Sequence, residues 1–219
     1  MRAAPAMPPR VRTALALFCA AVFALLALQV VLHGPMLEVD QDVSHWFSVH
    51  RNASLTQAML VVSSVHQTGK LLAVSVVLAL GLAVRGGLAG ARALLVVPLG
   101  MLLNLALKDA FQRARPVLED PLVRIATYSF PSGHAVASTV FYGALCALVF
   151  THTRSRVART AACAVALVMV PLVCFSRVYL GAHYPSDVLA GVAVGTLCLT
   201  LLLRPWRRPA RPGPGLPSR

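Results

Sequence analysis

The chain has 219 residues, of which 58% are apolar and 12% are charged, and its mean hydropathy is +0.73. These values reflect long apolar stretches rather than the core of an ordinary soluble domain, so an integral membrane protein is predicted. The net charge of +13 does not indicate a nucleic-acid binder, because the Lys and Arg residues punctuate apolar runs instead of gathering on one polar face.

The N-terminal segment, residues 1–12, is rich in proline and carries three arginines ahead of an apolar run at 13–32. A secretory signal peptide is the alternative, but its apolar core would span only about 7–15 residues and end in a small-residue cleavage site. The sequence before His33 lacks such a site. We therefore predict an uncleaved first transmembrane helix at 13–32.

Residues 36–52 mix three acidic residues with apolar ones and are too polar to span a bilayer. They predict a short interfacial helix between the first two transmembrane helices, with Trp46 among the headgroups. The second transmembrane helix is predicted at 55–84, with a polar stretch near its start. A Gly-rich turn at 85–92 leads to the third helix at 93–110.

A polar loop follows, and three further apolar runs predict transmembrane helices at 131–150, 160–175 and 185–203. The last helix begins with a proline, which suits a first helical turn. The final segment, 204–219, is rich in Pro, Gly and Arg and is predicted to be a disordered tail. The fold class is therefore all-α: a polytopic membrane protein with six transmembrane helices in one domain, residues 13–203.

The placement of charge predicts how these helices are oriented. If six helices alternate, thirteen arginines lie on one side with both termini, and all seven acidic residues lie on the other with the remaining seven basic residues. The positive-inside rule makes the arginine-rich side cytoplasmic. Three polar islands, at 108–116, 131–134 and 175–187, then share the extracytoplasmic side.

The five cysteines lie within or at the ends of apolar runs, and none belongs to a CxxC pair. This placement indicates neither disulfides nor a metal site. We interpret all five as buried free thiols: Cys19, Cys146, Cys163, Cys174 and Cys198.

The first two islands contain groups suited to an anion. Lys108 and Arg115 offer a point charge and a planar bidentate donor for phosphate oxygens, although a pair of headgroup-binding cations fits them equally well. Ser132, Gly133 and His134 open a helix, where free amides and the helix dipole favour an anion. An ordinary capped helix is the alternative for the second island.

The third island is the most informative, because charged residues beside apolar runs are costly unless they have a function. Asp187 follows His183 by four residues and can reach back to orient its imidazole. Carboxylates serve this purpose for histidines that act as nucleophiles or bases. The alternative is a structural salt bridge between Asp187 and Arg177.

Together the three islands resemble the phosphatidic acid phosphatase type 2 family, which includes lipid phosphate phosphatases and is related to vanadium haloperoxidases and glucose-6-phosphatase. The family motifs K-x6-RP, PSGH and SR-x5-H-x3-D match at Lys108–Pro116, Pro131–His134 and Ser176–Asp187, in that order. The resemblance covers about residues 36–203.

The resemblance implies a bacterial-type plasma-membrane enzyme that hydrolyses the terminal phosphate of a lipid phosphate or polyprenyl pyrophosphate without a metal or other cofactor. It implies that His183 is a nucleophile forming phosphohistidine, that Asp187 orients it, and that His134 protonates the leaving oxygen. The phosphate-binding groups that it implies are the side chains of Lys108, Arg115, Arg177 and Ser132 and the amides of Ser132 and Gly133.

A non-catalytic protein that binds or translocates lipid phosphates on the same fold is the alternative function. Holding phosphate needs only cations, so the intact His134, His183 and Asp187 favour turnover. A haloperoxidase is disfavoured because those relatives are soluble. The sequence does not choose among undecaprenyl pyrophosphate, phosphatidylglycerol phosphate, phosphatidic acid and a lipid A phosphate. It also leaves open the oligomeric state and whether Asn104 and Lys70 belong to the site or serve helix packing and snorkelling.

Overall fold

The computed structural model describes residues 7–118, 121–123 and 125–203, so the first half of the predicted N-terminal segment and the whole predicted tail lie outside the described residues. The described residues form helices and no strand, which confirms the all-α fold class. The helices are α1 (Pro9–Val31), α2 (Met36–Val49), α3 (Ala53–Val65), α4 (Thr68–Val84), α5 (Leu88–Leu94), α6 (Val96–Phe111), α7 (Gly133–His152), α8 (Arg156–Tyr179) and α9 (Pro185–Leu202).

Five stretches of the described chain are long and apolar enough to cross a membrane: α1, the combined α5 and α6, α7, α8 and α9. A sixth span results if α3 and α4, which meet at an angle of 41°, form one broken span. The break falls at His66 and Gln67, in the polar stretch noted near the start of the predicted second helix. There the His66 ring bonds to the Val62 carbonyl and to the Tyr142 hydroxyl, both at 2.8 Å, so the side chain ties the break to α7.

The turn between α4 and α5 is shorter than the predicted 85–92 segment. Gly86 has a φ of +76°, which glycine adopts without strain, and it closes α4. The Gly87 amide donates to the Leu82 carbonyl at 2.7 Å and the Gly86 amide to the Ala83 carbonyl at 2.9 Å, a hydrogen-bond pattern that ends helices. The chain is helical again from Leu88.

Two other helices extend beyond their predicted bounds. Helix α1 begins at Pro9, ahead of the predicted residue 13, because proline is well suited to the first turn. Helix α8 begins after Ser155, whose side chain accepts from the Ala158 amide, and continues to Tyr179. Arg177 therefore lies in the last turn of a helix and not in a loop.

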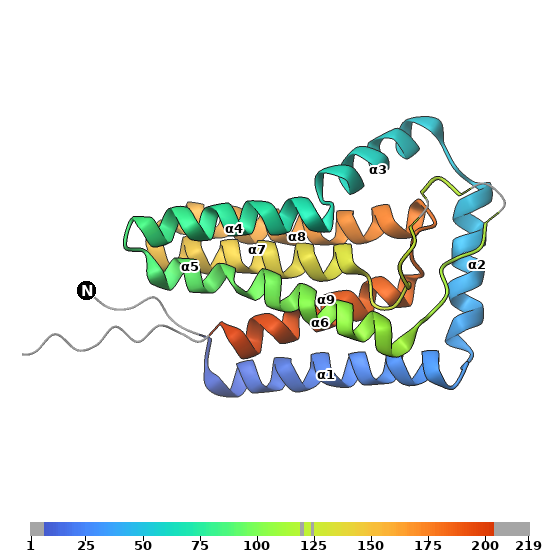
Figure 1. Ribbon diagram of the computed structural model, residues 1–219, viewed down its shortest axis with the longest axis horizontal. Helices are drawn as coiled ribbons and strands as arrows, with labels where there is room; N and C mark the ends of the chain where they lie inside the picture. The colour runs from blue at the N-terminus through green and yellow to red at the C-terminus, as the bar shows by residue number, and fades with distance from the viewer. Residues whose placement is uncertain (1–6, 119–120, 124, 204–219) are drawn as a thin grey trace, which may run out of the picture.

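The centre of the bundle is the contact between α7 and α9, which run side by side from the same end (Figure 1). Two glycines of α9 allow this close approach. A Cβ on Gly191 would lie 2.7 Å from the Ala135 Cβ, and one on Gly195 would lie 2.7 Å from the Thr139 Cβ. Small residues at such positions let helix backbones come together. The contact brings the first turns of α7 and α9 against each other, which is where two of the polar islands lie.

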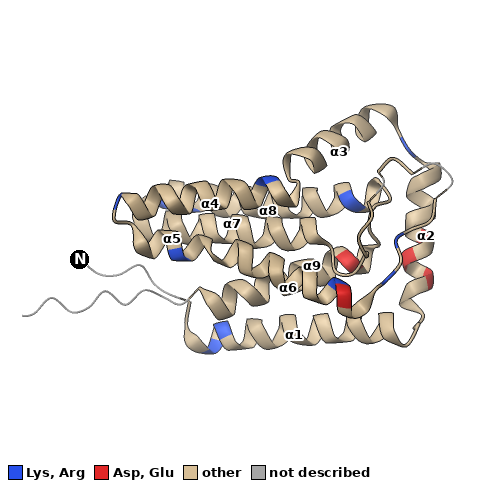
Figure 2. Ribbon diagram, in the orientation of Figure 1, with Lys and Arg blue, Asp and Glu red and all other residues tan. Residues whose placement is uncertain are grey.

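Helix α2 occurs where the interfacial helix was predicted, and Figure 1 shows it crossing the end of the bundle at a steep angle. Its inward face carries Asp40 and Ser44, both 2% exposed, whereas Trp46 is 54% exposed. The position of α2 at a membrane surface stays a prediction. Figure 2 shows that the described acidic residues gather at the end of the bundle crossed by α2.

All five cysteines are free, as predicted, but the prediction that all are buried is wrong. Cys19 and Cys198 are buried, Cys146 and Cys174 are half-buried, and Cys163 is exposed. Cys163 of α8 contacts Cys146 of α7 but is not covered by it. An apolar run alone does not reveal which face of a helix is covered.

Candidate active site

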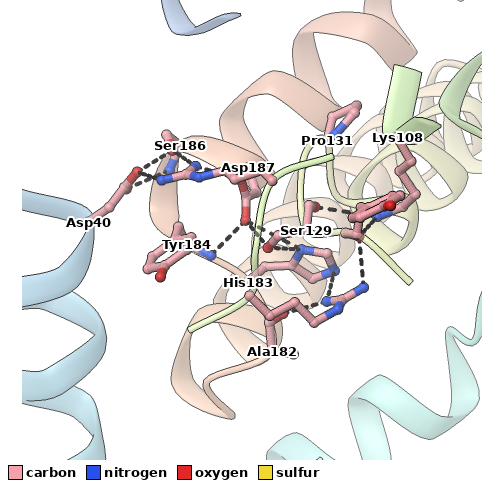
Figure 3. A network of polar contacts seen from close by, with 12 residues as sticks. Asp40, Lys108, Ser129, Pro131, Ala182, His183, Tyr184, Ser186 and Asp187 are labelled. Atoms are coloured by element: carbon pink, nitrogen blue, oxygen red, sulfur yellow. Dashed lines mark hydrogen bonds and ion pairs between the residues drawn. The ribbon is translucent and has the colours of Figure 1, made fainter. Parts of the chain in front are cut away.

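The three polar islands meet at the end of the bundle crossed by α2 (Figure 3). Lys108 lies in the last turn of α6, and Arg115 lies in the loop that follows. Ser132 is the N-cap residue of α7, and His134 lies in its first turn. The third island places Arg177 at the end of α8, His183 in the connecting loop and Asp187 in the first turn of α9.

His183 and Asp187 form the predicted pair. The His183 Nδ1 lies 3.5 Å from the Asp187 Oδ2, and its Nε2 lies 3.2 Å from Nη1 of Arg115. A guanidinium has only donors, so Nε2 accepts this hydrogen bond and Nδ1 carries the proton of the neutral ring. A lone pair on Nε2 is what an attack on phosphorus requires.

Burial keeps this imidazole neutral. His183 is 2% exposed, and desolvation lowers its pKa from the ordinary value of 6.5 to about 3. Asp187 opposes this shift, whereas the charges of Arg115 and Arg177 add to it. At neutral pH the ring is therefore uncharged and has its nucleophilic lone pair.

We expect the imidazole ¹⁵N signals of His183 in detergent-solubilised protein to keep the neutral-ring pattern from pH 8 down to pH 5. An imidazole with pKa near 3 binds almost no proton in this range, whereas the same residue in the unfolded chain titrates near 6.5. The folded state therefore loses stability as the pH falls below about 6.5, because only the unfolded chain takes up this proton. A His183 titration midpoint between pH 6 and 7 in the folded protein would contradict the assignment.

The alternative reading of Asp187 as an ion-pair partner of Arg177 is wrong, because its arginine partner is Arg113. Arg113 Nη1 donates to the Asp187 Oδ1 at 2.7 Å, so the same carboxylate serves an arginine through one oxygen and His183 through the other. Arg177 instead donates from Nη1 to the Ser63 hydroxyl. Sequence reasoning missed Arg113, although it stands two residues before the matched Arg115.

The loop at 127–129 holds Lys108 and Arg115 without neutralising them. Arg115 donates to the Thr127 carbonyl at 2.6 Å and to the Tyr128 carbonyl at 3.0 Å. Lys108 donates to the carbonyls of Tyr128 and Ser129. Within the described chain neither cation forms an ion pair with a carboxylate, so both charges are available to a bound anion.

Several buried polar atoms beside these cations have no hydrogen-bond partner in the described part of the chain: Ser132 Oγ, His134 Nε2, and Nε and Nη2 of Arg177. Arg177 is 2% exposed and Ser132 is fully buried. Leaving such groups unsatisfied costs about 1–3 kcal/mol each, and more for a charged one. An anion that accepts hydrogen bonds from Ser132 and Arg177, and from His134 once its ring is protonated, removes that cost, and a phosphate group has enough acceptor oxygens.

Ser63, at the end of α3, joins two of the predicted site residues. Its hydroxyl accepts from Arg177, and its backbone accepts a hydrogen bond from His134, which leaves Nε2 of that ring directed elsewhere. Sequence reasoning missed Ser63 because a serine within an apolar helix has no distinguishing pattern. Helix α3 thus belongs to the site, whereas the predicted motifs all lie after it in the chain.

One predicted phosphate ligand is not available. The Ser132 amide donates to the Asp187 carbonyl at 2.9 Å, because the close contact of α7 with α9 brings these groups together. The Ser132 hydroxyl remains without a partner among the described residues.

Asn104 Nδ2 donates to the Pro131 carbonyl at 3.2 Å and so holds the loop before α7. Lys70 instead bonds the Ser64 carbonyl, at the surface.

The chain is similar to known proteins in sequence and in fold. The PAP2 superfamily model matches residues 89–209. Phosphatidylglycerophosphatase B of Bacillus subtilis is 30% identical over 180 residues, which cover 81% of this chain and 88% of that protein. Lipid A 1-phosphatase of Rhizobium etli is 45% identical over 109 residues, covering 46% of this chain and 42% of that protein. A crystal structure of a transmembrane PAP2-type phosphatidylglycerolphosphate phosphatase from B. subtilis has a TM-score of 0.75 at 30% identity and covers 87% of this chain and 93% of its own.

Proposed function

Because the chain belongs to the PAP2 superfamily of membrane lipid phosphatases, we propose that it hydrolyses the terminal phosphate of a lipid phosphate or polyprenyl pyrophosphate through a phosphohistidine at His183. The observation that carries this proposal is a set of buried polar atoms of Ser132, His134 and Arg177 that lack a partner among the described residues and lie beside a neutral His183. One domain, residues 13–203, carries the activity.

In the first step, the lone pair on the His183 Nε2 forms a bond to phosphorus and the bond from phosphorus to the lipid oxygen breaks. The leaving oxygen takes its proton from Nε2–H of His134, a proton that this ring takes up when the negatively charged phosphate binds, because its other ring nitrogen already donates to the Ser63 backbone. Lys108, Arg115 and Arg177 bind the phosphoryl oxygens. Their positions are set before substrate arrives, so little reorganisation is needed as charge spreads over these oxygens.

To reach the phosphate, Arg115 must give up its hydrogen bond to the His183 Nε2. An incoming phosphate oxygen takes over this donor and leaves the nitrogen lone pair facing phosphorus. The Ala182 and Thr127 carbonyls keep the guanidinium in place meanwhile, at 2.6 Å each. Arg115 therefore donates a hydrogen bond to the nucleophilic nitrogen in the resting site and binds a phosphate oxygen when substrate is present.

In the second step, water attacks the phosphohistidine and gives a proton to His134, while the electron pair of the N–P bond returns to Nε2 of His183. Inorganic phosphate leaves and both histidines regain their starting states. Asp187 stays ionised throughout and stabilises the imidazolium that exists between the two steps. The cycle balances without a metal, because the three cations supply the charge.

The proposal is tested by phosphate release from purified protein in detergent, with EDTA present, against the four lipid classes named above. We expect release from at least one of them and inhibition by vanadate, which mimics five-coordinate phosphorus. Activity lost in EDTA and restored by Mg²⁺ would contradict a site built on Lys108, Arg115 and Arg177. Binding of the lipids without release would favour the non-catalytic alternative.

We also propose that both termini are cytoplasmic and that the site faces the opposite side of a bacterial inner membrane. Alkaline phosphatase fused after residue 120 should then be active, and fusions after residues 155 or 210 should be inactive, because this reporter folds only outside the cytoplasm. The thirteen arginines assigned to the cytoplasmic side motivate the expectation. The reverse pattern of activities would contradict the orientation and the proposed location of the site.

A further inference from the structure

A second buried carboxylate lies behind Asp187, on the side away from His183 (Figure 3). It belongs to Asp40, on the inward face of α2, and is 2% exposed. Arg113 joins the two acids: Nη2 lies 2.8 Å from the Asp40 Oδ2, and Nη1 lies 2.7 Å from the Asp187 Oδ1. Asp40 and Asp187 are far apart in sequence. The Arg113 guanidinium, in the loop after α6, therefore joins α2 to the start of α9.

This arrangement is fixed by further contacts. Ser186 donates its amide to the Asp40 Oδ1 at 3.0 Å and its hydroxyl to Oδ2, while the same hydroxyl accepts from Arg113. The Tyr184 ring lies under the guanidinium, with 4.3 Å between the Arg113 Cζ and the ring centroid. The guanidinium is therefore held on its edge and on its face, which leaves it one orientation.

The two oxygens of Asp187 have separate partners as a result. Oδ1 accepts from Arg113, whereas Oδ2 accepts from the Ser129 hydroxyl and from the Tyr184 amide, at 2.9 Å, and faces the His183 Nδ1. Rotation of the carboxylate would break the contacts of both oxygens at once. Arg113 thus determines which oxygen faces the imidazole.

We propose that Asp40 and Arg113 are positioning residues for the nucleophile, acting on His183 through Asp187. The proposal rests on the phosphohistidine function argued above. Asp40 orients Arg113 and shares its charge, and Arg113 orients Asp187. Neither residue touches the phosphate.

The charge of the cluster supports a role in the reaction in addition to one in the fold. Behind His183, the ionised groups that face one another are Asp40, Asp187 and Arg113, which sum to one negative charge while His183 is neutral. The charges of Arg115 and Arg177 also act on the ring, and in the proposed mechanism the bound phosphate offsets them. Attack on phosphorus turns the imidazole into an imidazolium, and the buried cluster then becomes neutral. Buried charges are least costly when they are matched, so the cluster favours the covalent intermediate over the resting state.

Without the Asp40 charge, Arg113 would pair with Asp187 alone. Arg113 would then neutralise the charge of the Asp187 carboxylate. No net negative charge would remain to stabilise the imidazolium of His183. We therefore expect Asp40→Asn, which preserves size, to lower kcat by about 10- to 100-fold, the range typical of groups that orient a reacting ligand from behind. KM for p-nitrophenyl phosphate should stay within about twofold, because the phosphate ligands are untouched.

Asp42→Asn is the matched control, because Asp42 lies on the same helix and is exposed. It should leave kcat unchanged. Arg113→Lys keeps the charge but cannot bridge two carboxylates with one planar group, so it should lower kcat as Asp40→Asn does. Thermal unfolding of each variant in detergent establishes that the measured protein is folded, and Arg113→Lys supplies the test if Asp40→Asn does not fold.

The decisive readout is a double-mutant cycle with Asp187→Asn. If Asp40 acts through Asp187, then Asp40→Asn should cause no further loss of kcat in the Asp187→Asn background. The same loss in both backgrounds, or a full kcat in Asp40→Asn alone, would overturn the proposal. An inactive wild-type protein, or an active His183→Ala, would instead contradict the proposed function, so the two failures are distinguishable.

Discussion

Replacing His183 by alanine is expected to abolish phosphate release from every substrate, however good its leaving group. In the proposed mechanism the attacking atom is the Nε2 of this ring, which is neutral and faces Asp187 through Nδ1. No leaving group replaces a missing nucleophile. In another covalent hydrolase the removal of the nucleophile lowers kcat on the order of 10⁶-fold, and a loss of that size is expected here.

The measurement compares purified wild type and His183→Ala on a lipid phosphate and on p-nitrophenyl phosphate. His45→Ala is the matched control, because it makes the same substitution at an exposed histidine of α2 and should retain full activity. Turnover of either substrate by His183→Ala above the background of the assay would show that another group attacks phosphorus.

Replacing His134 by alanine is expected to have an effect that depends on the leaving group. With a lipid alkoxide, which needs a proton, the first step should slow by about 10²- to 10⁴-fold, the usual contribution of a general acid. With p-nitrophenyl phosphate the first step should change little, because the phenolate leaves without a proton. The unpartnered Nε2 of His134 in the described site motivates this role.

Steady-state rates cannot separate the two proposed roles of His134, because in the proposed mechanism the same residue also activates water in the second step. A single-turnover experiment avoids this difficulty. His134→Ala should release one equivalent of p-nitrophenolate and retain acid-labile phosphate on the protein, whereas His183→Ala should do neither. Equal first-turnover losses in the two variants, on both substrates, would show that the roles are assigned wrongly.

The helices were largely predictable from sequence because each apolar run of about 20 residues is long enough to cross a bilayer. The runs do not reveal where a polar side chain finds a partner on another helix. The break between α3 and α4 depends on the bond from His66 to Tyr142, 76 residues later. The extension of α8 carries Arg177 into a helix because the segment after Phe175 packs within the site and is not a free loop.

In the candidate site, too, some contacts follow from local sequence spacing and others depend on the tertiary structure. His183 and Asp187 are four residues apart, so their contact follows from local spacing. The pairing of Arg113 with Asp40 joins residues 73 apart and depends on how α2 lies across the bundle. The Ser132 amide shows the opposite case: a free amide was expected from the local rule for helix ends, but a carbonyl of α9 takes it. Local spacing therefore predicted the contact between His183 and Asp187, and the tertiary structure added the residues that hold this pair.

The central claim is that phosphate is transferred to His183. It is tested most directly by mixing the protein with a ³²P-labelled lipid phosphate in detergent and EDTA, quenching in alkali, and mapping the label. We expect label that survives alkali, is lost in acid, resides on the peptide containing His183, and persists longer in His134→Ala. Label on a different residue, or phosphate released at full rate by a protein that never becomes labelled, would contradict it.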